Sequence, residues 1–215
     1  MTRFDPHRMM AAGILMLFLG MTFIPTMGYI ELPDIETDVV QPTSTLRAQY
    51  ELPPPQDIDM SLEETMLRRM SVREFTEEQV SEEDLSTLLW HACGQRSDGS
   101  ITLPGFGESE AVELYVLLED AAYKYSAIDH SLLYYKEGDY RSSVGWQYEA
   151  PTVLCLVWNT TATHEHVASA QIGAAFQNIA WTANALGLGT VVTGEYPSPI
   201  NTELGVPETE KGLII

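Results

Sequence analysis

The chain has 215 residues, and its composition of 45% hydrophobic and 20% charged residues is typical of a globular domain rather than of a disordered protein. Acidic residues number 31 against 11 basic ones, which gives a formal net charge of −20. Because binding to a polyanion needs a basic surface, this charge argues against nucleic acid as a partner. The two cysteines, Cys93 and Cys155, are too few for a disulfide framework, and we expect both to be small buried apolar residues.

Residues 9–30 carry no charge and are rich in Met, Leu, Ile and Phe. About 20 apolar residues are enough to cross a bilayer as a helix. Basic residues precede this run and acidic residues follow it, which favours an N-terminus inside the cytoplasm and a main domain outside it. We therefore expect residues 1–30 to be an N-terminal transmembrane helix of a single-pass membrane protein with an extracytoplasmic domain. A cleaved signal peptide is the alternative, although residues 23–28 offer only a poor cleavage site.

Residues 31–60 show no clear periodicity and contain five prolines, which discourage both a helix and a central strand. We expect this segment to be an extended tether that leads to the folded domain. An arm packed along the domain surface is the alternative that the sequence leaves open.

Besides a short helix near Asp139, three helices are predicted from residue 61 onward. Ser61 and Glu64 form a capping box, after which Leu62, Met66 and Met70 share one face of a short helix. The second helix is predicted from Ser81 to Gly94, and the third, which is rich in alanine, covers residues 166–186. The buried stripe of the second helix is formed by Leu85, Leu88, Leu89 and Ala92.

Six strands are predicted in the same part of the chain, over residues 112–118, 123–127, 132–136, 152–158, 190–193 and 212–215. The second and third form a hairpin that turns at Asp129 and His130. The run 152–158 is almost entirely apolar, which predicts a central strand covered on both faces. Residues 95–110 are predicted to be a loop, and Asp139 caps a short helix. Helices and strands interleave without a regular βαβ repeat, so the predicted fold class is α+β.

Arginines are concentrated in one place of this acidic chain. Arg68, Arg69 and Arg73 fall within six positions and flank Ser71. Guanidinium groups pair with phosphate in two-point geometry, and a hydroxyl completes such a site. The alternative is a solvated helix end, where cations suit the negative end of the helix dipole.

The order Arg-x-Ser-x-Arg over residues 69–73 is followed, about a hundred residues later, by Gly-Ala-Ala-Phe-Gln-Asn-Ile at 173–179 and Ala-Leu-Gly-Leu-Gly at 185–189. This pair of motifs resembles the nitroreductase-like superfamily of FMN-dependent oxidoreductases. The resemblance covers residues 61–215 and implies a nitroreductase-like fold, with a central mixed sheet flanked by helices, and a homodimer with FMN at its interface.

The resemblance also implies which residues hold the cofactor. Arg69, Ser71 and Arg73 correspond to the segment that binds the FMN phosphate and ribityl chain, and Arg68 has a weaker claim. Residues 192–196 fall where the family lays backbone amides against the isoalloxazine ring. The implied ring contacts are Thr193, Gly194 and Glu195.

Within the superfamily, residues 89–94 and 104–107 resemble the thiazole/oxazole (azoline) dehydrogenase-like branch, which implies that Gly105, Gly107 and Ser109 line the flavin. Azoline dehydrogenases carry a Lys-Tyr pair in the loop before the long helix, and residues 159–166 contain neither residue. Lys124 and Tyr125 belong to the predicted hairpin and are expected to be structural. The family continues beyond the last predicted strand, whereas this chain ends at Ile215, so its C-terminus looks truncated.

The sequence therefore predicts an FMN-dependent oxidoreductase that transfers a hydride from a reduced donor such as NAD(P)H to an electron-poor acceptor, a nitro compound or a quinone. No catalytic side chain is expected, because the flavin carries the chemistry. No metal site is expected either, since His164 and His166 lie too close in sequence to converge as helical ligands do. A peptide-modifying azoline-type dehydrogenase and a catalytically inactive, membrane-tethered binding protein are the alternatives.

Overall fold

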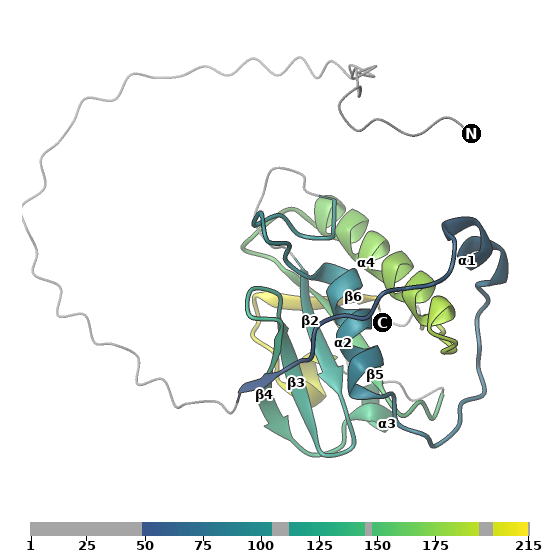
Figure 1. The fold of residues 1–215 in the computed structure, drawn as a ribbon. Helices are drawn as coiled ribbons and strands as arrows, with labels where there is room; N and C mark the ends of the chain where they lie inside the picture. Colours follow the sequence, from purple (N-terminus) through teal and green to yellow (C-terminus); the bar gives the residue numbers. More distant parts are fainter. Residues whose placement is uncertain (1–48, 105–111, 145–147, 194–199, 215) are drawn as a thin grey trace, which may run out of the picture. The chain divides into compact units, whose positions relative to one another are not determined.

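The computed structural model describes residues 49–104, 112–144, 148–193 and 200–214 (Figure 1). The predicted membrane anchor, residues 1–30, lies outside these ranges, as do residues 31–48 of the predicted tether. Within the described ranges, no helix combines the length and the apolar character that a membrane crossing requires.

The described strands form a six-stranded sheet in the order β1-β4-β3-β2-β5-β6. Their bounds are Gln49–Glu51 (β1), Val112–Leu117 (β2), Ala121–Ser126 (β3), Ser131–Glu137 (β4), Val153–Asn159 (β5) and Glu210–Ile214 (β6). Every neighbouring pair is antiparallel, so the expected mixed sheet is wrong for these strands. Two short turns connect β2, β3 and β4, and strands joined in this way can only run antiparallel.

Two helices, α2 (Glu82–Cys93) and α4 (Glu165–Ala185), cover one face of the sheet (Figure 1). Both confirm the helices predicted for these segments. Ser81 caps α2 by accepting a hydrogen bond from the backbone N–H of Asp84, as Ser61 caps α1 (Leu62–Arg68) by accepting from Glu64. Two short elements complete the fold: α3 (Arg141–Val144) and the π-helical turn η2 (Ile200–Leu204).

The core lies on both faces of the central strands, as the apolar run at 152–158 predicts. On β2, Leu114 and Val116 pack with α2 and α4, whereas the alternating residues Tyr115 and Leu117 face the other side. That second side is covered by Leu204 of η2 and by the segment that follows it. Cys93 and Cys155 are both buried, as expected, and burial raises the pKa of the Cys155 thiol to about 12.

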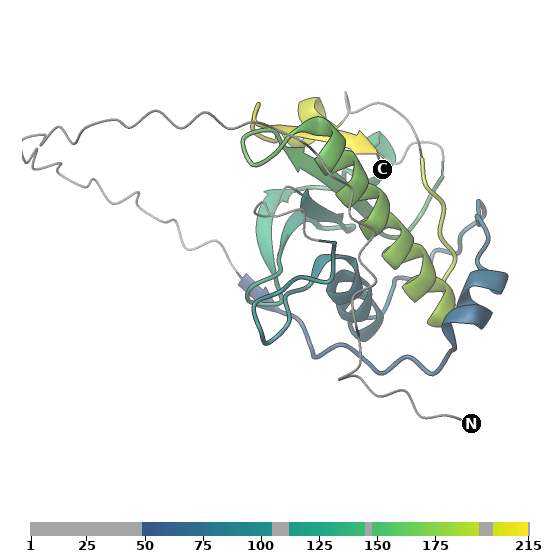
Figure 2. The ribbon, with the colours of Figure 1, turned by 90° about the horizontal axis from the view of Figure 1, so that it is seen from above.

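One local prediction, a strand at residues 190–193, is wrong, and the apolar side chains of the first predicted helix are exposed. The shared face of the first helix is exposed, because α1 touches the rest of the domain through the buried Thr65, whose carbonyl accepts a hydrogen bond from Asn184 on α4. Leu62 and Met70 are 59% and 67% exposed. In Figures 1 and 2, α1 lies beside the C-terminal end of α4.

Residues 190–193 do not form the predicted strand. Of these residues, only Thr190 takes part in a β-bridge.

The described end of the 31–60 segment packs along the domain, which is the alternative that the sequence leaves open. Residues Gln49–Glu51 add the edge strand β1 to β4, and Leu52 is buried. Farther along, the backbone N–H of Gln56 donates to the hydroxyl of Thr87 on α2 at 2.9 Å. This arm therefore belongs to the folded unit from Gln49 onward.

Candidate functional site

The two motif segments of the chain meet in space. Ser71 and Thr190 form an isolated parallel bridge, in which the backbone N–H of Val72 donates to the carbonyl oxygen of Thr190 at 2.9 Å. Gly189, the residue before Thr190, lies close to the side chain of Val72. A Cβ atom added at Gly189 would lie 2.8 Å from Cγ1 of Val72. Glycine is therefore the residue that lets the arginine segment pack against the end of α4.

The arginines of this segment differ in whether a carboxylate of the protein pairs with them. Arg68 forms an ion pair with Glu64 at 2.7 Å, one helical turn back, and its side chain is 63% exposed. Arg69, Ser71 and Arg73 are exposed as well, and neither Arg69 nor Arg73 has an ion-pair partner among the described residues. Arg69 and Arg73 are therefore available to an anion from solution, and Arg68 is partly neutralised.

A cavity of about 150 Å³ lies beside the contact between the two segments. Its lining is mainly apolar and comes from α2, β5 and α4, from the segments just before α2 and β5, and from the segment after α4. It includes Phe75, Val80, Leu88, Phe176, Ile179, Leu188 and Val191. A flat aromatic ring system matches such walls better than a sugar or a peptide backbone does.

One polar atom of this cavity stands out. The hydroxyl oxygen of Thr152, the residue before β5, is buried and makes no hydrogen bond with any described residue. A buried hydroxyl without a partner is destabilising, and such groups are uncommon in native proteins. Thr152 is absent from the sequence-based set of site residues, although a hydroxyl at the start of the otherwise apolar run 152–158 was a visible signal.

The remaining predicted cofactor contacts fall into two groups. Thr193 lines the cavity, so the structure brings it together with the arginine segment through Thr190. The other five predicted contacts lie outside the described residues: Gly105, Gly107, Ser109, Gly194 and Glu195.

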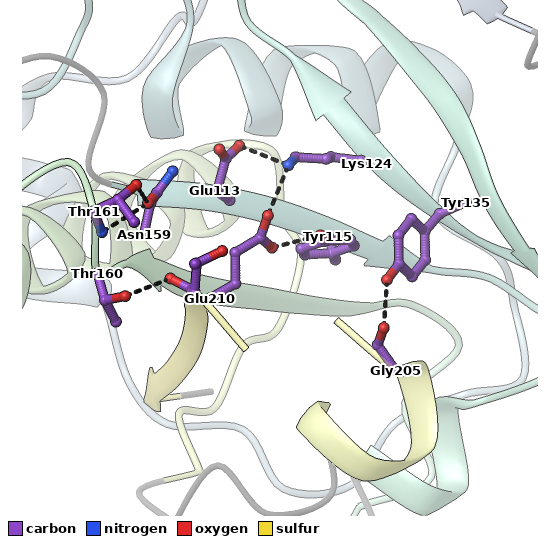
Figure 3. Close-up of polar contacts among 10 residues, drawn as sticks. Glu113, Tyr115, Lys124, Tyr135, Asn159, Thr160, Thr161, Gly205 and Glu210 are labelled. Carbon is purple, nitrogen blue, oxygen red and sulfur yellow. Dashed lines mark hydrogen bonds and ion pairs between the residues drawn. The ribbon is translucent and has the colours of Figure 1, made fainter. Parts of the chain in front are cut away.

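A second polar cluster lies on the opposite side of the sheet (Figure 3). The side chain of Glu210 on β6 is nearly buried, accepts a hydrogen bond from the Tyr115 hydroxyl at 2.6 Å and pairs with Lys124 at 3.2 Å. Lys124 also pairs with Glu113 at 3.2 Å, so its ammonium lies between two carboxylates. The pKa of Tyr115 is raised far above its ordinary value, mainly by burial and secondly by the hydrogen bond to Glu210. These bonds join β6 to β2 and β3, which is a structural role for Lys124.

The His-Glu-His sequence does not form a ligand cluster in the described part of the chain. The rings of His164 and His166 stack on each other with centroids 5.8 Å apart, at the N-terminus of α4. Among the described residues, no three His, Cys, Asp or Glu side chains are grouped as metal ligands would be.

Comparison with known proteins identifies the family to which this geometry belongs. The model of the nitroreductase family matches residues 66–215, which is most of the chain. The chain belongs to the nitroreductase family. The predicted resemblance is thereby confirmed, and membership places the protein among oxidoreductases.

Two similar proteins each carry the name of a putative nitroreductase. One, from Methanocaldococcus jannaschii, is 27% identical over 163 residues, which are 64% of this chain and 80% of that protein. The other, a crystal structure from Ralstonia eutropha JMP134, is 26% identical with a TM-score of 0.71, and the match covers 90% of this chain and 95% of that one.

A more distant structure shares the fold alone. It is a chain of the Escherichia coli microcin synthetase McbBCD complex with truncated pro-MccB17 bound, which is 16% identical with a TM-score of 0.58. The match covers 86% of this chain and 82% of that one.

Proposed function

We propose that this member of the nitroreductase family is an FMN-dependent oxidoreductase that transfers a hydride from a reduced donor such as NAD(P)H to an electron-poor acceptor, a nitro compound or a quinone. The observation that carries the proposal is the contact between Ser71 and Thr190. It joins two arginines without described ion-pair partners to the rim of an apolar cavity that contains an unsatisfied hydroxyl.

The residues at this site fit the three parts of FMN. Arg69 and Arg73 supply charge for the phosphate, and the exposed Ser71 hydroxyl supplies a further hydrogen bond. The apolar cavity walls suit the isoalloxazine ring, and the Thr152 hydroxyl offers its unused hydrogen bond to a polar atom of the ring. FMN supplies the hydride transfer itself, while the protein side chains bind it, orient it and exclude water from its ring.

The direct test is the absorption spectrum of the purified chain, with and without added FMN. We expect FMN to remain bound through gel filtration. We also expect Arg69→Ala and Arg73→Ala each to weaken FMN binding at least about tenfold, since a hydrogen bond to a charged group contributes roughly 1.5–3 kcal/mol.

Arg96→Ala is the matched control. Arg96 is another exposed arginine, and among the described residues its side chain bonds to Ser100 and Ile101 of its own loop. A chain that binds no FMN would exclude the enzymatic proposal and leave the inactive binding protein. Equal effects of all three substitutions would show that general charge, rather than a phosphate site, is responsible.

We propose a homodimer as well, because four large apolar side chains of the α1 region are exposed within nine residues, and clustered exposed apolar side chains mark interaction surfaces. These side chains are Leu62, Met66, Leu67 and Met70. Light scattering after gel filtration measures the mass, and Leu67→Glu is expected to shift it toward the monomer.

The uncharged run at residues 9–30 supports a further proposal, that the chain is held in a membrane with its main domain outside the cytoplasm. Retention in the membrane fraction after washes with high salt and with carbonate is expected. Release by salt alone would exclude a spanning helix.

A further inference from the structure

A cleft of about 670 Å³ lies between the arm that carries β1, the turn from β2 to β3 and the start of α2. Three tyrosines on one face of the sheet line it. Tyr50 on β1 is the cross-strand partner of Leu132 on β4, and Tyr134, two residues along β4, is the partner of Tyr123 on β3. Cross-strand partners and residues two apart on a strand share a face, so the strand register brings these rings together.

The cleft has an apolar floor and exposed aromatic walls. Leu52, Leu85 and Leu132 are buried beneath it, and all three belong to the main core. The rings of Tyr123 and Tyr134 meet edge to face with centroids 6.1 Å apart, and Tyr50 is 47% exposed. The volume falls within the range of small-molecule sites, about 300–1,000 Å³.

The charges around this cleft all have one sign. Glu82 lies at the α2 end and Glu119 and Asp120 lie at the turn, and none of the described residues that line the cleft is basic. Asp120 accepts a hydrogen bond from the Tyr123 hydroxyl at 2.6 Å. The pKa of Tyr123 is raised to about 12, mainly by burial and secondly by this hydrogen bond.

The guanidinium of Arg141, which interacts electrostatically with Glu119, is held mainly by Asp139. Two of its nitrogens bond to the carboxylate of Asp139, at 2.9 and 2.7 Å. Glu82 and Asp120 have no ion-pair partner among the described residues.

We propose that this cleft binds an organic cation with an apolar body, of the quaternary ammonium or alkylated amine class. Tyrosine faces attract such cations through their ring quadrupoles, and the attraction is stronger where the cation leaves bulk water. The carboxylates at the rim add Coulombic attraction and repel anions. Carboxylates alone are expected anywhere on so acidic a chain; the aromatic rings, apolar floor and concave shape at the same place distinguish this site.

The site is separate from the proposed flavin site. Val80 borders both cavities, but Thr152 lines only the first, and no residue of the arginine segment lines the cleft. Binding of a cation therefore does not depend on whether the chain binds FMN.

Calorimetric titration of the full chain with benzyltrimethylammonium tests the proposal, with benzyl alcohol as the uncharged aromatic comparison. We expect saturable binding of the cation and at least tenfold weaker binding of the alcohol. Tyr134→Leu, which retains apolar bulk, and Asp120→Asn, which retains an acceptor for Tyr123, are each expected to weaken cation binding at least threefold.

Glu208→Gln serves as the charge-matched control, because Glu208 is exposed and does not line the cleft. It is expected to leave the affinity unchanged, and circular dichroism checks that each variant is folded. No binding of the cation up to millimolar concentration would overturn the proposal. So would equal binding of the alcohol, or equal affinities of all three variants and the wild type.

Discussion

The backbone N–H of Val72 donates a hydrogen bond to the carbonyl oxygen of Thr190 at 2.9 Å, although more than a hundred residues separate the two in sequence. This bond places the arginine segment at the end of α4, beside the apolar cavity. The proposed cofactor site therefore depends on how closely two backbones approach, as much as on the charges of the arginines.

Gly189→Ala tests that dependence. The added methyl group would lie 2.8 Å from Cγ1 of Val72, so one of the two segments must move. We expect FMN affinity to fall at least about tenfold, because a displacement of this kind misaligns the groups that hold the phosphate. Fluorescence quenching of FMN on titration with the protein measures the affinity.

Gly173→Ala is the control for this substitution. A Cβ atom at Gly173 on α4 meets nothing within 4 Å, and alanine in a helix is more stable than glycine by roughly 1 kcal/mol. We expect this variant to bind FMN normally and to unfold at a higher temperature. Normal FMN binding by both variants would show that the close approach is not needed for the site.

Thr152→Val tests whether the unsatisfied hydroxyl serves the ligand. Valine keeps the shape of the side chain and removes a buried polar atom that has no partner among the described residues. Without FMN, we expect the variant to be as stable as the wild type or more stable, by up to about 1–3 kcal/mol. With FMN, we expect weaker binding and a shifted visible absorption band.

Urea denaturation without the cofactor and an FMN titration provide the two readouts. A variant that loses stability without FMN would show that the hydroxyl is satisfied in the folded protein. Unchanged FMN affinity would show that it does not contact the cofactor.

Local signals in the sequence were sufficient for the helices α2 and α4. The Ser81 cap and the apolar stripe of α2 depend on spacing within one segment, and the structure reproduces both. The face of α1 illustrates the limit. Its apolar spacing was equally visible, but the position of α1 at the end of α4 leaves Met66 and Met70 exposed, and position is a tertiary property.

The proposed site was predictable only in part for the same reason. Arg69, Ser71 and Arg73 were found as a charge cluster in an acidic chain and as a family motif. Thr152 was not, because its missing hydrogen bond exists only once β5 packs beside the cavity. The mixed sheet was an expectation from the family resemblance; the directions of β5 and β6 depend on non-local pairing, and both strands run antiparallel to their neighbours.

Tyr115→Phe tests the cluster that holds β6 in place. The substitution removes a 2.6 Å hydrogen bond to the nearly buried carboxylate of Glu210 and leaves Lys124 as the side-chain partner of this carboxylate among the described residues. We expect a loss of about 1.5–3 kcal/mol in the free energy of unfolding, which is typical of hydrogen bonds to charged groups.

Tyr135→Phe is the matched control, because the Tyr135 hydroxyl donates to the carbonyl of Gly205 at 3.1 Å in a more exposed position. A neutral, exposed bond is expected to contribute about 1 kcal/mol or less. Urea denaturation of both variants gives the comparison. Equal losses would mean that the carboxylate of Glu210 adds nothing beyond an ordinary hydrogen bond.

His130 gives the folded protein a dependence on pH near neutrality. Its Nε2 lies 2.7 Å from the Ser86 hydroxyl and 3.1 Å from the carbonyl oxygen of Pro53, and its Nδ1 lies 2.9 Å from the Tyr125 hydroxyl. A neutral ring satisfies all three contacts, with Nε2 as donor and Nδ1 as acceptor from Tyr125. Burial lowers the pKa of His130 below 6.5 despite the opposing effect of Pro53.

The direction of the pH effect follows from linkage. Since the pKa of His130 is lower in the folded state than in the unfolded state, the unfolded chain binds more protons below about pH 6.5. The stability that neutral His130 provides is present above that pH and is lost as the pH falls toward its folded-state pKa. The pKa values of Asp98 and Asp139 are lowered from 3.8, so the stability that these two carboxyls provide is lost in a more acidic range.

We therefore expect the free energy of unfolding to decrease between about pH 7 and pH 5 in the wild type and to change less in His130→Asn. Asparagine tolerates the positive φ of 46° at this position, so the backbone of the turn is retained. His164→Asn, at the N-cap of α4, controls for the loss of a histidine as such. Parallel pH profiles for the wild type and His130→Asn would show that the contact between His130 and the arm at Pro53 is insensitive to protonation.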